Sequence, residues 1–263
     1  MSIVNVTPDS FSDGSRLSDA ETAFRYASQC LDEGADILDI GGESTRPFAE
    51  PVPLEEEWTR VGPVLELLHE RLPVAIVSID TRKPEIARRA LASGARIVND
   101  ITGCDPQGEM PHVVAEAGAG IVIMHMQGTP ETMQVEPKYQ DVVGEILDFL
   151  ADRVRAAMKA GIPAERIAID PGIGFGKTLE QNLEILRSLD RFRKLGHAVL
   201  IGTSRKRMIG ELTGRGVSDR TSGSVASVLF AASRGAAVAR VHDVAATVDA
   251  LRVWHALEQS HVG

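Results

Sequence analysis

The sequence predicts an α/β fold, a single (β/α)8 TIM-barrel domain over residues 1–263. Short runs of strand-forming residues recur along the chain, and between them lie stretches whose apolar residues repeat at three-to-four spacing, as in amphipathic helices. Strands that alternate with helices form parallel sheets. About eight such units in this length fit a closed barrel better than a doubly wound sheet, which usually carries a glycine-rich phosphate loop after its first strand.

The predicted strands are Ile3–Val6, Ile37–Ile40, Ala75–Ile79, Ile97–Val98, Ile121–Met124, Ile167–Ile169, Val199–Ile201 and Val238–Val241. The predicted helices contain good helix formers, and several are followed by a glycine, which favours the left-handed conformation at helix ends. They are Asp19–Glu33, Leu54–Arg71, Pro84–Ser93, Met110–Ala117, Val142–Ala160, Leu179–Arg193, Ser222–Ser233 and Val244–Leu257. The first strand begins almost at Met1, so we expect an abbreviated N-terminus that leaves the barrel bottom uncovered.

Composition narrows the classes of function. A hydrophobic content of 43% is enough for a sizeable core, and no apolar run approaches the roughly 18 residues of a membrane span. The N-terminus lacks the features of a signal peptide, so we expect a cytoplasmic protein. Cys30 and Cys104 lie far apart without metal-ligand spacing, which predicts buried, inert thiols. The formal net charge of −9 argues against a nucleic-acid surface, although a local basic pocket could still bind a small anion.

Polar residues end or follow most of the predicted strands. A lone Asp in such a place is more often a helix cap than a catalyst, but a barrel brings the carboxyl ends of all its strands to one face, so the repetition predicts a shared site. A carboxylate there can accept two parallel N–H bonds from the amidine-like edge of a heterocycle. The residues are Asp39, Asp80, Asn99, His125, Asp170, Ser204 and His242, together with the first loop from Asn5 to Gly14. For Asp100, capping and ligand binding both remain open.

Three further segments have more than one interpretation. Gly172–Thr178 resembles the end of a phosphate loop, but Pro171 stands where the motif needs its first glycine, so we interpret the similarity as a chance match. Phe175 in this segment either covers a flat ring or packs in the core. The turn Gly202–Arg207 precedes a probable helix and could bind a carboxylate or a ring oxygen, or be a solvated basic turn. Arg240 and His242 alternate on the last predicted strand and, with Asn5, could hold a diphosphate.

Glu43–Pro47 is interpreted as a mobile polar loop that a barrel enzyme could close over its substrate. His125 lies in no metal-ligand pattern, and we assign it no metal.

Taken together, these stretches resemble dihydropteroate synthase, a family of the pterin-binding barrel group. The resemblance runs from Ile3 to His242 through the motifs NVTPDSFSDG, DIGGESTRP, SIDTRKPE, VNDITG, MHMQGTP, IDPGIGFGKT, GTSRKR and RVHDV. It implies condensation of 6-hydroxymethyl-7,8-dihydropterin diphosphate with 4-aminobenzoate, giving 7,8-dihydropteroate and diphosphate. The partners implied are these small molecules rather than nucleic acid or membrane, with a homodimer formed through outer helices.

The resemblance also implies roles for individual residues. It implies that the pterin edge is contacted by Asp80, Asn99 and Asp170, and that Lys206, Met124 and Phe175 lie near the ring. It implies that the diphosphate is held by Asn5, Arg240 and His242, and that the aminobenzoate pocket is shaped by Phe11, Thr45, Arg46 and Pro47. Asp13 is then expected to stabilise the pterin cation that remains when diphosphate departs. The catalytic set is therefore Asp13, Lys206, Arg240 and His242. The implied cofactor is Mg²⁺, with Asn5 as its first protein contact and Asp9 as its second.

The chain departs from the family pattern at a few positions. Ile173 replaces a usual phenylalanine, Arg207 a usual serine, and Ser15 a usual second glycine. We expect Ile173 and Arg207 to border the ring or aminobenzoate sites, and Arg207 to alter affinity for aminobenzoate or sulfonamides. Two alternative functions are a pterin-dependent methyltransferase, which would share Asp80, Asn99 and Asp170 without needing a diphosphate site, and a catalytically silent pterin-binding barrel.

Overall fold

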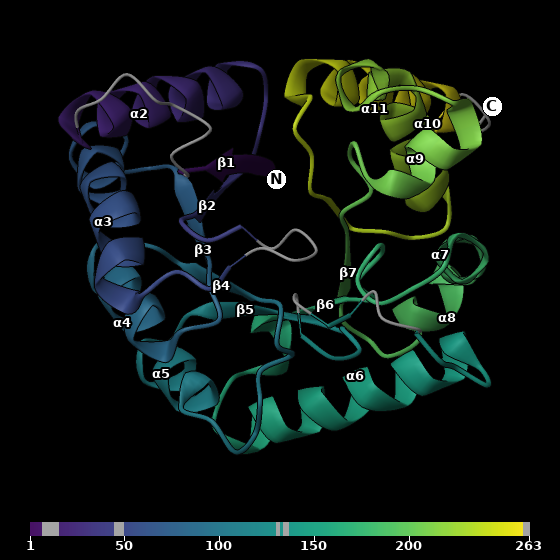
Figure 1. Ribbon diagram of the computed structural model, residues 1–263, viewed down its shortest axis with the longest axis horizontal. Helices are drawn as coiled ribbons and strands as arrows, with labels where there is room; N and C mark the ends of the chain where they lie inside the picture. Colours follow the sequence, from purple (N-terminus) through teal and green to yellow (C-terminus); the bar gives the residue numbers. More distant parts are fainter. Residues whose placement is uncertain (7–15, 45–49, 130–131, 134–136, 260–263) are drawn as a thin grey trace.

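The computed structural model describes residues 1–6, 16–44, 50–129, 132–133 and 137–259. Within these ranges, eight parallel strands follow one another in sequence order around a curled sheet (Figure 1). A bridge between Ser2 and Val241 joins the end of the sheet to its beginning, and the Ile3 N–H donates to the Val241 carbonyl at 3.0 Å. The strands are β1 (Ser2–Asn5), β2 (Ile37–Gly41), β3 (Ile76–Asp80), β4 (Ile97–Asp100), β5 (Gly120–Met124), β6 (Ile167–Asp170), β7 (Ala198–Ile201) and β8 (Val238–Ala239). The predicted barrel is confirmed.

Helices surround the sheet on its outer side (Figure 1). Those in the described residues are α2 (Arg16–Asp32), α3 (Leu54–Arg71), α4 (Pro84–Ala92), α5 (Met110–Glu116), α6 (Val142–Lys159), α7 (Leu179–Arg187), α8 (Leu189–Arg193), α9 (Arg207–Thr213), α10 (Thr221–Ser233) and α11 (Val244–Gln259), with 3-10 turns at Ala164–Arg166 and Val217–Asp219.

Several element boundaries differ from the sequence prediction, and those near the site matter most. The single helix predicted over Leu179–Arg193 is two helices, because Ser188 leaves the helical conformation with φ −104° and ψ 14°. The last predicted strand ends at Ala239, so Arg240 and His242 follow β8 instead of lying within it. Asp80, Asn99 and Asp170 conversely lie within the ends of their strands.

The alternation of side chains along each strand separates the core from the site. Successive residues of a strand point to opposite faces. In β2, Leu38 and Ile40 join the apolar core beneath the helices, whereas Asp39 between them contacts Asn99 inside the barrel. In β3, Val77 and Ile79 likewise join the core. The polar residues of the strands are thereby directed into the barrel interior.

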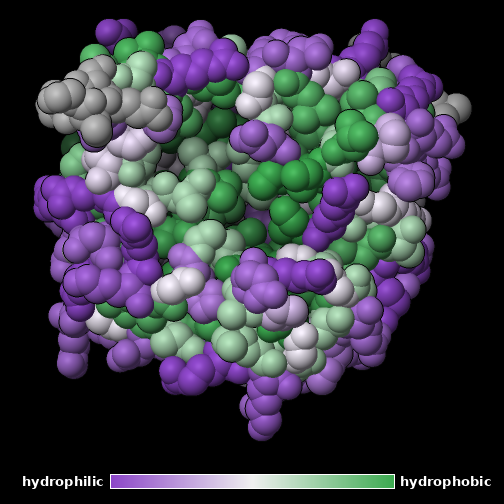
Figure 2. All heavy atoms as spheres, turned by 180° about the vertical axis from the view of Figure 1, so that it is seen from behind, coloured by the Kyte–Doolittle hydropathy of each residue, from purple (hydrophilic) through white to green (hydrophobic). Residues whose placement is uncertain are grey.

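The face opposite to that of Figure 1 has a hollowed, largely apolar centre within a hydrophilic rim (Figure 2). A cavity of about 160 Å³ lies among the amino-terminal ends of β1, β2 and β8 and helix α11, far along the strands from their polar carboxyl ends. Cys30 and Cys104 are both buried free thiols, which confirms the predicted burial. Across the described ranges, no helix is long and apolar enough to span a bilayer.

Candidate active site at the carboxyl ends of the strands

An arginine held by two buried carboxylates lies at the centre of the candidate site. Arg240 donates through Nε to Asp39 Oδ2 at 2.6 Å and through Nη2 to Asp80 Oδ2 at 2.7 Å. Asp39 is fully buried and Asp80 is 7% exposed, so their charges require this compensation. Asn99 adds a bond from Nδ2 to Asp39 Oδ2 at 3.0 Å. Residues from β2, β3, β4 and the segment after β8 therefore meet at one point.

Asp80 is poised to change its charge near neutral pH. Burial raises the pKa of Asp80 to about 7; Arg240 opposes this shift, and the neighbouring Asp39 adds to it. Asn5 and Asp80 both border Gly41: the position that a Cβ would take on this glycine is 3.4 Å from Asp80 Cβ and 3.6 Å from Asn5 Oδ1. Asn5 therefore lies close to Asp80. The structure thus brings Asn5, Asp80, Asn99 and Arg240 together, as the sequence predicted.

A second group of predicted residues gathers around Asp170. This carboxylate is 6% exposed at the end of β6 and accepts the Gly172 N–H through Oδ1 at 2.7 Å. Burial raises the pKa of Asp170, while Lys206 acts in the opposite direction. Met124 ends the neighbouring strand β5 as the register partner of Asp170 and is 2% exposed. An apolar side chain and a carboxylate therefore adjoin, as a flat heterocycle with a polar edge requires.

Lys206 belongs to the same group. Its Nζ bonds to the carbonyl of Ile173 and lies 4.4 Å from the centre of the Phe175 ring, a cation–π distance. Burial lowers the pKa of Lys206 to about 8, with Asp170 opposing the shift. Ile173 itself is fully buried, so this departure from the family pattern contributes its backbone carbonyl to Lys206 and its side chain to the core.

Lys177 holds the loop that carries Phe175. Its buried Nζ donates to the carbonyls of Gly172 at 2.9 Å and Phe175 at 2.8 Å, and lies 3.1 Å from His125 Nδ1. Burial lowers the pKa of Lys177 to about 7 and that of His125 to about 3, so the His125 imidazole is neutral at pH 7. When Lys177 carries its ammonium, which can only donate, His125 Nδ1 is the acceptor. This use of Lys177 agrees with the interpretation of its motif as a chance match to a phosphate loop.

The turn after β7 holds His242 through Ser204. His242 Nδ1 lies 3.1 Å from Ser204 Oγ, which also accepts the His242 backbone N–H at 3.1 Å. Arg205 adopts a left-handed φ of 57° and pairs with Asp243 through Nε at 3.0 Å. Arg207, in contrast, has a side chain that is 85% exposed and pairs with Glu211 at 2.5 Å.

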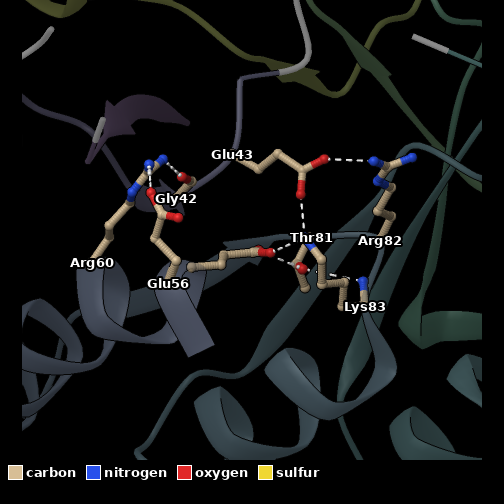
Figure 3. Close-up of polar contacts among 8 residues, drawn as sticks. Gly42, Glu43, Glu56, Arg60, Thr81, Arg82 and Lys83 are labelled. Atoms are coloured by element: carbon tan, nitrogen blue, oxygen red, sulfur yellow. Dashed lines mark hydrogen bonds and ion pairs between the residues drawn. The ribbon is translucent and has the colours of Figure 1, made fainter. Parts of the chain in front are cut away.

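A second charged network supports the strand that ends in Asp80 (Figure 3). Lys83 pairs with both Glu43, just after β2, and Glu57, fully buried on α3. Thr81, which follows Asp80, donates to Glu57 Oε1 at 2.8 Å, and Arg82 pairs with Glu43 at 2.8 Å. Sequence reasoning missed Glu57, because it stands in a run of glutamates that is typical of a solvated helix face.

Other predicted residues fall elsewhere. Asp100, the last residue of β4, caps the turn that follows the strand: its Oδ1 accepts the Thr102 N–H at 2.8 Å and its Oδ2 the Cys104 N–H at 2.9 Å. No cluster of three or more His, Cys, Asp or Glu suited to a metal ion occurs within the described ranges. Asp9, Phe11, Asp13, Thr45, Arg46 and Pro47 lie outside the described residues.

The fold and the site together define a barrel enzyme that binds a small anionic heterocycle at the carboxyl ends of its strands. The chain matches the pterin binding enzyme family over residues 1–242. It is 51% identical over 262 residues to the dihydropteroate synthase of Neisseria meningitidis serogroup C, covering 98% of this chain and 92% of that protein. The corresponding values for Escherichia coli (strain K12) are 46% over 256 residues, with 97% and 90% covered.

Solved structures agree. The Xanthomonas albilineans dihydropteroate synthase with 4-aminobenzoic acid has a TM-score of 0.92 at 50% identity, and the same enzyme with 7,8-dihydropteroate has 0.88 at 48%; each match covers 98% of this chain and 92% of the other. The chain belongs to the dihydropteroate synthases of the pterin binding enzyme family.

Proposed function

We propose that this chain condenses 6-hydroxymethyl-7,8-dihydropterin diphosphate with 4-aminobenzoate to form 7,8-dihydropteroate and diphosphate. The observation that carries the proposal is the convergence of two kinds of group at one barrel end. Asp170, Asp80 and Asn99 suit the hydrogen-bonding edge of a pterin, while Arg240 and His242 suit a diphosphate. The relatives named dihydropteroate synthase, and the similar structure with bound 7,8-dihydropteroate, support the same reaction.

The pterin is bound by the group around Asp170. The Asp170 carboxylate accepts two parallel N–H bonds from the amino group and the adjacent ring nitrogen, a charge-assisted pair that fixes the orientation of the ring. Met124 and Phe175 contact its faces, and Lys206 donates to its polar atoms. The Lys206 ammonium already lies over Phe175, so an inserted ring would find both groups in place.

The diphosphate is bound by Arg240 and His242, with Asn5 beside them. Contacts within the described residues use two of the five N–H bonds of Arg240, and the remainder can donate to phosphate oxygens. An Mg²⁺ ion fits the chemistry of this corner, because the Asn5 carboxamide oxygen is a hard ligand and Mg²⁺ is commonly held by one or two protein oxygens plus substrate phosphates. We propose Asn5, with Asp9 second, as its protein contacts. When bound, the ion would neutralise charge on the leaving diphosphate.

The reaction then needs no nucleophile from the protein. The C–O bond of the ester breaks, and diphosphate departs with the electron pair while Arg240 and His242 stabilise its charge. The pterin methylene carbon is left electron-deficient, and Asp13 is proposed to stabilise it. The aromatic amine of 4-aminobenzoate attacks this carbon, forms the C–N bond and loses a proton. Phe11, Thr45, Arg46 and Pro47 are proposed to form the aminobenzoate pocket.

Arg207, the main difference from the family pattern, is proposed to border the aminobenzoate site. Its exposed guanidinium belongs to the first residue of α9, beside the turn that carries Lys206, and it pairs with Glu211. We expect Arg207→Ser to change the dissociation constants of 4-aminobenzoate and of a sulfonamide, measured by calorimetry in the presence of diphosphate and Mg²⁺. If neither constant moves, Arg207 plays no part in that pocket.

We further propose a cytoplasmic homodimer formed through outer helices. Light scattering after size-exclusion chromatography tests the dimer, and a monomeric mass across micromolar concentrations rejects it.

The function itself is tested by mixing the purified protein with the pterin diphosphate and Mg²⁺, with and without 4-aminobenzoate. We expect diphosphate and dihydropteroate to form together, and only when aminobenzoate is present. Binding of both substrates without turnover would indicate a silent pterin-binding barrel, and binding of a reduced pterin with no affinity for the diphosphate ester would favour a methyltransferase. Either result would overturn the proposal.

A further inference from the structure

One buried carboxylate connects the two halves of the candidate site. Asp39 Oδ2 accepts both from Arg240 Nε at 2.6 Å and from Asn99 Nδ2 at 3.0 Å. Asn99 belongs to the proposed pterin edge and Arg240 to the proposed diphosphate site. Asp39 itself is fully buried and lies deeper in the barrel than Asp80, because its register partner on β3 is Ser78, two residues earlier. Its position therefore suits contact with other residues of the site rather than with a ligand.

We propose that Asp39 is a positioning residue, which fixes Arg240 and Asn99 in the orientations that receive the two parts of the substrate. The inference rests on the proposed function, since that function assigns the two parts. Asp39 acts through its partners and takes no direct part in the chemistry.

The hydrogen-bonding chemistry of an aspartate explains how it would do so. An ionised carboxylate only accepts, so Asp39 must face the NH2 end of the Asn99 amide. The Asn99 oxygen and one N–H are then left for a ligand. Arg240 is held at two points, Nε by Asp39 and Nη2 by Asp80, and two bonds from one planar guanidinium fix the direction of its remaining donors.

Positioning and simple electrostatics predict opposite effects of the same substitution. Asp39 carries negative charge close to the proposed diphosphate site, so neutralising it would strengthen binding of an anion if Coulomb interaction alone mattered. If Asp39 instead orients Arg240, its loss weakens binding of that anion. Asp39→Asn keeps nearly the same shape, removes the charge and allows the Asn99 amide to turn over, so the variant separates the two explanations.

The experiment measures dissociation constants of the pterin diphosphate with Mg²⁺, and of the free hydroxymethyl pterin, by calorimetry. For Asp39→Asn we expect about tenfold weaker binding of the diphosphate ester, a smaller loss for the free pterin that acts through Asn99, and a lower kcat/KM. Unchanged or tighter binding of the ester overturns the proposal. Ser78→Ala is the matched control: this neighbouring residue is fully buried and its hydroxyl has no hydrogen-bond partner among the described residues. Both constants should stay at their wild-type values.

A double-mutant cycle isolates the route through Arg240. We expect the losses in ester affinity of Asp39→Asn and Arg240→Ala to be strongly non-additive, and additive losses contradict positioning through that arginine. If Asp39→Asn does not fold, Arg240→Lys replaces it, because a lysine keeps the charge but cannot bridge Asp39 and Asp80. Wild-type ester affinity in Arg240→Lys would overturn the inference. The dissociation constants are measured independently of turnover. If the wild-type protein showed no synthase activity, the proposed function would be rejected, but the role of Asp39 in binding could still be tested.

Discussion

The charge of Lys206 gives the proposed mechanism its clearest pH dependence. Burial lowers the pKa of this side chain to about 8, so at pH 7 roughly nine-tenths of the free protein carries the ammonium and at pH 9 only about one-tenth does. If the charged form is the one that contacts the pterin, kcat/KM should fall about fivefold between pH 8 and 9 and about tenfold for each further pH unit. The profile of kcat/KM is the suitable measurement, because it reports ionisations of the free enzyme and free substrate.

The control is Lys206→Arg. A guanidinium remains charged throughout the accessible range, so the descending limb near pH 8 should disappear even if the absolute rate falls through poorer geometry. Titration of the substrates is common to both proteins and cancels in the comparison. Two other groups of the site, Lys177 and Asp80, also titrate near neutral pH, each with a pKa at about 7, and Lys206→Arg replaces neither of them. If the variant keeps a descending limb at the wild-type position, the assignment to Lys206 is refuted.

Three further predictions follow from the same structure. Asp170→Ala removes a charge-assisted contact worth about 1.5–3 kcal/mol, so calorimetry should show pterin affinity at least about tenfold weaker, whereas Asp190→Ala on the exposed side of α8 should leave it unchanged. Gly172→Ala should prevent folding or lower the free energy of unfolding, measured in urea, by at least about 4 kcal/mol, because the new Cβ would lie 1.9 Å from the His125 carbonyl oxygen. Gly196 has a similar φ of 84° but no atom within 4 Å of such a Cβ, so Gly196→Ala should lower the free energy of unfolding by only about 1–2 kcal/mol. Because the pKa of Asp80 is raised to about 7, the folded ligand-free protein binds more protons than the unfolded chain between about pH 4 and 7. Asp80 therefore lowers the free energy of unfolding as the pH rises through that window. Urea titrations should show that this decrease with pH is smaller in Asp80→Asn.

Local patterns were sufficient for the barrel and for most of the described site. Strand-forming runs and helix periodicity located the elements within a few residues, since both signals depend on neighbouring positions. The rule that parallel strands end at one face then placed Asp80, Asn99 and Asp170 together. The break at Ser188 was missed because the apolar spacing continues through it.

Contacts between distant positions were beyond such reasoning. The bond from Arg240 to Asp39 spans 201 positions and exists only because the barrel closes between β8 and β1. The polar end of β2 was recognised, but nothing local to Asp39 indicated that its partner was an arginine. Lys177 similarly looked like part of a degenerate phosphate motif, because the folding of its loop back onto His125 leaves no local signature.

The carboxylates of this site have two functions that cannot be altered separately by truncation. Asp39 and Asp80 both compensate the buried charge of Arg240, and removing either to alanine leaves that charge with one partner in a poorly hydrated interior, an arrangement that is strongly destabilising. A loss of activity in such a variant would therefore mix lost folding with lost binding. Isosteric Asp→Asn changes preserve the packing while they change the charge, and double-mutant cycles subtract the effects of each single change. Together they show which part of the effect belongs to the substrate.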